Sequence, residues 1–237
     1  MAIQTKLIEY THDGTLLEGC LAWDDANTDP RPGILVSHAW AGRDGFTTEK
    51  AILLAEQGYV GFALDVYGKG VLGQSKEENE ALLHAQLHDR VRLQDRLKAC
   101  LQVMRDQPQV DAARTAIIGY CFGGLCAMDL ARSGADVLGA VSMHGLPFAP
   151  DVTHPISAKM LICHGWDDPM ADPESIVALA QELSEAGADW QLHAHGGKMH
   201  AFTNPTADDP DSGMVYDADA DRRSWQAATN FFAEVLA

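Results

Sequence analysis

A cysteine at position 121 stands between glycines in the segment GYCFG. Gly119 lies two residues before it and Gly123 two residues after it, which is the Gly-x-Ser-x-Gly spacing with sulfur in place of oxygen. In that pattern a strand turns sharply into a helix, and small residues are needed because the strand and the helix pass closely. The turn holds its central residue in a strained conformation above the sheet. The segment therefore predicts that Cys121 is a nucleophile.

The same position favours thiolate chemistry. A helix N-terminus offers amide groups and a positive dipole end, which lower the pKa of a thiol and stabilise an oxyanion. The alternative is that Cys121 is a small buried residue in a glycine-rich packing turn. Gly119 and Gly124 also have the spacing of a phosphate loop, but Leu125 stands where that motif requires lysine.

A cysteine nucleophile needs a base, and the base needs an orienting group. In folds that use such a turn, the chain order is nucleophile, acid, histidine. After the apolar segment KMLICHG, the segment WDDP supplies Asp167 and Asp168, and a later loop supplies His200. Pro169 biases Asp168 toward an extended backbone, so we expect Asp168 to be the acid and Asp167 to be its rival.

Two further pairs of histidines have spacings that occur in metal sites. His193 and His195 share one face of an expected strand, and His84 and His88 are four residues apart on an expected helix. Neither pair has a clear carboxylate or cysteine to complete a site. We therefore expect surface or packing histidines, no metal and no cofactor.

The elements that position these groups follow an alternating pattern. Residues 6–23 predict two strands around the hairpin dipeptide Asp13–Gly14. Beyond them, apolar strands are expected at 33–38, 59–67, 115–120, 137–144, 159–165 and 190–195. Amphipathic helices are expected at 47–57, 75–87, along the Leu93, Leu97 and Leu101 stripe, at 124–133, at 174–187 and from about 221 to 236. Such alternation indicates a mostly parallel sheet covered by helices on both faces, with reactive groups beyond the carboxyl ends of its strands.

The composition limits the class of protein. A chain of 237 residues with 46% hydrophobic content suits one domain over residues 1–237, without a separate cap domain. Acidic residues outnumber basic ones 34 to 17, which argues against binding to nucleic acid or to anionic membranes. Five cysteines without framework spacing favour a reducing compartment, and no signal peptide or membrane span is visible. These features predict a soluble cytoplasmic protein.

Three motifs together resemble one family. The motifs that carry the resemblance are, in chain order, GYCFGG, HGWDDP and KMHAFTNP. Together they are similar to the dienelactone hydrolase family. Its members are carboxymethylenebutenolidase-like cysteine hydrolases with an α/β-hydrolase fold. The likeness covers nearly the whole chain, from PGILVSHAWAG to the last helix. It implies a catalytic triad of Cys121, Asp168 and His200, and oxyanion-hole amides on Trp40 and Phe122.

The chain departs from the family where the substrate is expected to bind. Ala39 replaces a glutamate that takes part in activation of the cysteine, and two arginines that hold the lactone carboxylate correspond to Lys69 and Asn204. Lysine is a point charge without a bidentate fork, and asparagine is uncharged. Tyr67 and His144 are further candidates to line the pocket, with structural roles as the alternative. Small neutral esters or lactones are therefore expected to match or exceed dienelactone as substrates.

Three functions fit these residues. The first is an ester or lactone hydrolase that works through a thioacyl-enzyme on Cys121. The second is a redox-responsive thiol protein, because an accessible cysteine of low pKa is readily oxidised. The third is a non-catalytic binder of small molecules on the same fold. The complete set of cysteine, acid and histidine favours the hydrolase, since a binder has no need for all three groups.

Overall fold

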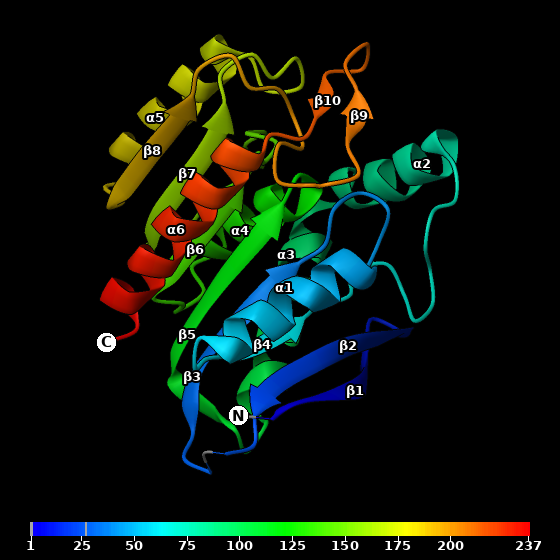
Figure 1. The fold of residues 1–237 in the computed structure, drawn as a ribbon, viewed down its shortest axis with the longest axis vertical. Coiled ribbons are helices and arrows are strands. Elements are labelled where there is room, and N and C mark those ends of the chain that lie inside the picture. Colours follow the sequence, from blue (N-terminus) through cyan, green and yellow to red (C-terminus); the bar gives the residue numbers. More distant parts are fainter. Residues whose placement is uncertain (1, 27) are drawn as a thin grey trace. The chain divides into compact units, whose positions relative to one another are not determined.

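The computed structural model describes residues 2–26 and 28–237 (Figure 1). The chain divides into two compact units, residues 1–118 and 119–237. The organisation of residues 1–237 as one domain stays a prediction. Within the described ranges, no helix combines the length and the apolar character that crossing a membrane requires.

The first unit contains a mixed sheet with its helices. Its strands follow the order β1-β2-β4-β3-β5, in which β3 and β4 are parallel and β2 is antiparallel to both β1 and β4. The predicted hairpin is confirmed: Asp13 and Gly14 join β1 and β2 with φ of 49° and 70°, the geometry in which asparagine, aspartate and glycine are preferred. The elements are β1 (Ile3–His12), β2 (Thr15–Asp24), β3 (Arg31–Ser37), α1 (Gly45–Glu56), β4 (Val60–Ala63), α2 (Lys76–Leu87), α3 (Arg90–Arg105) and β5 (Val110–Tyr120).

One strand of this unit is shorter than the sequence suggests. The apolar run 59–67 predicts a strand throughout, but β4 ends at Ala63. The buried carboxylate of Asp65 accepts hydrogen bonds from the backbone N–H groups of Tyr67 at 2.9 Å, Gly68 at 3.0 Å and Glu18 at 3.1 Å. Because this side chain satisfies the backbone amides, the chain leaves the sheet and remains buried.

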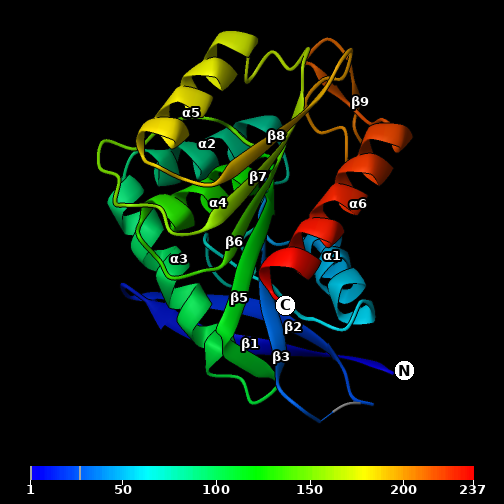
Figure 2. The same ribbon diagram turned by 90° about the vertical axis from the view of Figure 1, so that its left-hand side faces the viewer.

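The second unit is built on the parallel strands β6-β7-β8. Figure 2 shows these strands with α4 and α5 on one face and α6 on the other. The elements are α4 (Phe122–Arg132), β6 (Gly139–Met143), β7 (Lys159–Gly165), α5 (Pro173–Glu185), β8 (Trp190–His195), β9 (Asp208–Asp209), β10 (Met214–Val215) and α6 (Ala218–Val235). Helix α6 begins earlier than expected because the Asp217 carboxylate caps it by accepting from the N–H of Ala220 at 2.9 Å.

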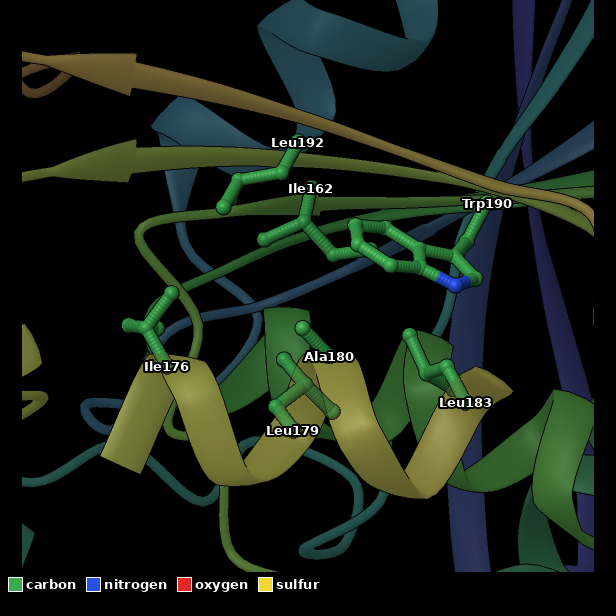
Figure 3. Close-up of a pocket in the computed structure, with 7 residues that line it drawn as sticks. All are labelled: Ile162, Ile176, Leu179, Ala180, Leu183, Trp190 and Leu192. Carbon is green, nitrogen blue, oxygen red and sulfur yellow. The ribbon is translucent and has the colours of Figure 1, made fainter. Parts of the chain in front are cut away.

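Apolar side chains fill the space between α5 and the strands beside it (Figure 3). They leave a cavity of about 10 Å³, which is too small for any organic ligand. This region is therefore a packed part of the core. Its lining residues are Ile162, Ile176, Leu179, Ala180, Leu183, Trp190 and Leu192.

Candidate active site

The turn at Cys121 has the strained geometry that the glycine spacing predicts. Strand β5 ends at Tyr120 and α4 begins at Phe122, so Cys121 alone forms the corner, with φ 56° and ψ −117°. A Cβ atom added at Gly119 would lie 1.8 Å from the carbonyl oxygen of Gly123. Only glycine fits at position 119, because the strand and the first turn of the helix are in backbone contact. Cys121 is half-buried, whereas the other four cysteines are buried.

Asp168 and His200 form a close and buried pair. His200 Nδ1 lies 2.6 Å from Asp168 Oδ2, and the two side chains are 1% and 0% exposed. Asp168 Oδ1 accepts a further hydrogen bond from the N–H of Met170 at 2.8 Å. The neighbouring Asp167 is exposed. Of the two candidate acids, Asp168 is therefore the one that contacts the imidazole.

The surroundings of His200 favour its protonated form. Burial lowers the pKa of this imidazole, but the charge of Cys121 and the hydrogen bond with Asp168 raise it by more, to about 10. Nε2 of His200 is buried, and the Cys121 side chain interacts with this imidazole, although no contact of Nε2 among the described residues has normal hydrogen-bond geometry. The ring therefore has one nitrogen fixed by a carboxylate and one nitrogen available for proton transfer.

The segment from β9 to β10, which the sequence motifs do not indicate, bonds to the backbone of His200. The N–H of His200 donates to the carbonyl of Gly213 at 2.9 Å, and the N–H of Val215 donates to the carbonyl of His200 at 3.0 Å. Gly213 packs against the loop that carries Asp168 and Pro169 (the acid loop), since a Cβ atom at position 213 would lie 2.2 Å from Pro169 Cγ. The turn signal PDSG at 210–213 could have indicated this segment. The segment from β9 to β10 thus keeps the histidine and the acid loop together.

Two of the expected substrate-binding residues in the second unit bond to other protein groups. His144 Nδ1 accepts from the N–H of Cys121 at 3.1 Å, and His144 Nε2 lies 2.7 Å from Thr203 Oγ1. Asn204 Oδ1 accepts from the N–H and the hydroxyl of Thr206, at 3.1 and 2.9 Å. Contact of His144 or Asn204 with substrate stays a prediction.

The expected residues of the first unit have their own partners. Lys69 Nζ pairs with the carboxylate of Glu9 and lies 3.5 Å from Glu18 Oε2. The hydroxyl of Tyr67 donates to the carbonyl of Trp40 at 2.9 Å and so holds the peptide that follows Trp40. Lys69 is therefore neutralised by carboxylates, and Tyr67 has a backbone-holding contact. The roles of Trp40, Tyr67 and Lys69 toward substrate stay predictions.

The histidine pairs do not assemble into a metal centre. In the described part of the chain, no group of three or more histidine, cysteine, aspartate or glutamate side chains could hold a metal ion. His84 is exposed on α2, His88 is exposed at the C-cap of that helix, and His193 is exposed on β8.

Comparisons with solved structures define the class of protein. The chain matches the crystal structure of a dienelactone hydrolase-like promiscuous phosphotriesterase from metagenomic libraries over 100% of both chains, with a TM-score of 0.94 and 33% identity. A dienelactone hydrolase-type structure from Klebsiella pneumoniae matches over 98% of this chain and 99% of its own, with a TM-score of 0.82 and 19% identity. The predicted α/β-hydrolase fold, with a mostly parallel sheet, is therefore confirmed.

Sequence comparison narrows the class to one family. The model of the dienelactone hydrolase family matches residues 17–236, so the chain belongs to this family. A carboxymethylenebutenolidase of Pseudomonas putida is 27% identical over 203 residues, which cover 81% of each chain. The chain is therefore a hydrolase that acts on esters or lactones, as the three sequence motifs predict.

Proposed function

We propose that this protein hydrolyses small esters or lactones through a thioacyl-enzyme on Cys121, with His200 as the general base and acid and Asp168 as its orienting group. The observation that carries the proposal is the buried hydrogen bond of 2.6 Å between His200 Nδ1 and Asp168 Oδ2. This bond holds the imidazole in one orientation and stabilises its protonated form. The strained turn at Cys121 and the membership of the family support the same assignment.

The first half-reaction transfers the acyl group to sulfur. The Cys121 thiolate attacks the carbonyl carbon, a C–S bond forms, and the carbonyl oxygen becomes an oxyanion. The N–H of Phe122, in the first turn of α4, lies at the positive end of the helix dipole and is our candidate to stabilise this charge. When the C–O bond breaks, Nε2 of the His200 imidazolium gives its proton to the departing alcohol.

The second half-reaction restores the enzyme. His200, now neutral, accepts a proton at Nε2 from a water molecule, whose oxygen attacks the thioester carbonyl. The C–S bond breaks, the carboxylic acid leaves, and the thiolate–imidazolium pair forms again. Asp168 remains ionised throughout and stabilises the imidazolium in both halves.

The substrate is proposed to be a small neutral ester or lactone. Where the family has two arginines that hold a carboxylate, this chain has Lys69, which pairs with Glu9 and Glu18, and the uncharged Asn204. A carboxylate on the substrate therefore gains little at these positions.

The test is a panel of esters, lactones and thioesters assayed with the wild-type protein and Cys121→Ala. We expect turnover of neutral esters by the wild type and a loss of at least ~10³-fold in the variant, since the nucleophile and its covalent intermediate are removed. Turnover that persists in Cys121→Ala would assign the reaction to another group.

Phosphotriester hydrolysis is a second candidate activity. The observation that favours it is the full-length likeness to a solved promiscuous phosphotriesterase. A neutral dialkyl aryl phosphate added to the same panel tests this activity. Turnover that disappears in Cys121→Ala would place it at the same site, and no turnover by the wild type would exclude it.

A further inference from the structure

His144 occupies an unusual backbone position at the end of β6. Its φ is 39°, and its N–H donates to the carbonyl of Cys163 at 2.8 Å. Gly145 follows in a site without space for a side chain, because an added Cβ would lie 2.2 Å from Ser142 Oγ and 2.9 Å from the Cα of Gly124. A non-glycine residue in the left-handed region persists only where its surroundings hold it. The chain therefore turns sharply at His144 and fixes the direction of its ring.

The two nitrogens of this ring bond to two different parts of the candidate site. The N–H of Cys121 can only donate, so His144 Nδ1, 3.1 Å away, must accept and carries no proton. The proton is then on Nε2, which donates to Thr203 Oγ1 at 2.7 Å. The same N–H of Cys121 also donates to the carbonyl of Met143 at 3.0 Å, so the two acceptors share one proton. The network assigns a neutral ring with its proton on Nε2.

The ring is also packed against the loop that carries His200. His144 and Thr203 are 2% and 1% exposed. The ring of His144 meets those of His200 and Phe202 edge-on, with centroids 5.1 Å apart in both cases. A neutral ring in this position adds no charge that would repel a His200 imidazolium.

We infer that His144 is a positioning residue, which links the Cys121 turn to the loop 200–203 and so fixes the separation between the Cys121 sulfur and His200 Nε2. The inference rests on the proposed function, because it concerns the geometry of the same cysteine and histidine. A strained turn has to be held by its neighbours, and His144 bonds directly to the backbone of the strained residue. Small errors in the placement of reacting groups reduce the rate strongly.

The experiment compares a disruptive variant with a conservative one. His144→Leu removes both hydrogen bonds, whereas His144→Gln keeps an acceptor and a donor on one side chain. Thr203→Val removes the second partner and nearly preserves its shape, and His193→Gln is a matched control on the exposed face of β8. The measurements are kcat and KM for p-nitrophenyl acetate, the rate of alkylation of Cys121 by iodoacetamide at pH 7, and folding by circular dichroism.

We expect His144→Leu and Thr203→Val to lower kcat about tenfold or more, with KM within about threefold of the wild type. Alkylation should slow in the same variants. His144→Gln should remain within about threefold of the wild type, and His193→Gln should not change either rate. Folded Leu and Val variants that keep the wild-type kcat, or a Gln variant as slow as the Leu variant, would overturn the inference.

A spectroscopic measurement covers the case in which His144→Leu does not fold. In protein labelled with ¹⁵N-histidine, the ring signals of His144 are identified by their absence in His144→Gln. We expect a proton on Nε2 and none on Nδ1 at pH 7. A proton on Nδ1 would contradict the bond from Cys121. The inference and the proposed function can fail separately, because turnover that survives in Cys121→Ala refutes the function, whereas loss in Cys121→Ala with full activity in Thr203→Val refutes the inference alone.

Discussion

Two contacts between a basic side chain and a carboxylate differ in this molecule in how far they are exposed to solvent. His200 and Asp168 meet where their side chains are 1% and 0% exposed. Lys69 and Glu9, in the first unit, meet where theirs are 42% and 53% exposed. In the buried pair, the low exposure of both side chains strengthens their interaction, so the carboxylate fixes the orientation of the imidazole and favours its charged form. In the exposed pair, the carboxylate neutralises a cation that water would otherwise solvate. The same kind of contact can therefore fix the orientation of a buried side chain in one place and belong to the solvated surface in another.

Breaking the buried pair should lower the rate far more than breaking the exposed pair. His200→Ala should lower kcat for a neutral ester by ~10²–10⁴-fold, the usual effect of removing a general base. Glu9→Gln, which breaks the exposed pair, should leave kcat within about twofold. Steady-state kinetics on p-nitrophenyl acetate, with circular dichroism as the check on folding, measures both. Equal effects of the two substitutions would show that burial does not decide the role of these pairs.

The next effect concerns the acid of the buried pair. Asp168→Asn should lower kcat strongly, although less than His200→Ala does, because an amide can keep the contact but cannot stabilise the imidazolium. Asp167→Asn is the matched control, since it is the exposed neighbour in the same loop. Greater loss in Asp167→Asn than in Asp168→Asn would assign the acid to the other residue.

The raised pKa of His200 predicts how the reactivity of Cys121 depends on pH. Because the imidazole pKa is about 10, its positive charge persists as the pH rises through the ordinary histidine range and is lost only near pH 10. The adjacent positive charge of His200 favours attack by the sulfur, so we expect iodoacetamide to alkylate Cys121 already near pH 6. The rate of alkylation against pH measures this. A simple rise centred near pH ~8.5, as for an isolated thiol, would refute the thiolate–imidazolium pair.

The smallest expected effect concerns the charge of the substrate. A lost charge-assisted hydrogen bond is worth about one to two decades in specificity, so dienelactone should be turned over no better than small neutral esters. Asn204→Arg should shift the ratio of kcat/KM values toward dienelactone by up to ~10-fold, with little change for neutral esters. A wild-type enzyme that prefers dienelactone by about a hundredfold would show that another residue binds the carboxylate.

The parts of the fold that depend on local sequence could be predicted. The hairpin follows from the turn chemistry of Asp13 and Gly14, and the buried strand β7 follows from its apolar residues. The strained turn at Cys121 could be predicted because Gly119 leaves a recognisable spacing. The early end of β4 could not, since it depends on where the Asp65 carboxylate finds its donors.

The contacts that hold the candidate site come from positions far apart in the sequence. His144 was a candidate for the pocket, but its bonds to Cys121 and Thr203 depend on a left-handed backbone that no local pattern indicates. His200 is supported by Gly213, in the turn before β10, and by Val215 of β10. Strands β9 and β10 have two residues each and are too short to give a periodic signal. Residue types indicated the chemistry, and tertiary contacts determined its geometry.

Iodoacetamide inactivation followed by mass mapping distinguishes Cys121, the proposed nucleophile, from the other four cysteines. Burial raises the pKa of the Cys20 thiol, and it raises the pKa values of Cys100 and Cys163 to about 12, so these thiols should react slowly. Cys121 is half-buried at the start of a helix. We expect Cys121 to be labelled first, with activity lost in proportion to its labelling. Labelling of Cys20 or Cys100 first, with activity lost in step, would contradict the account.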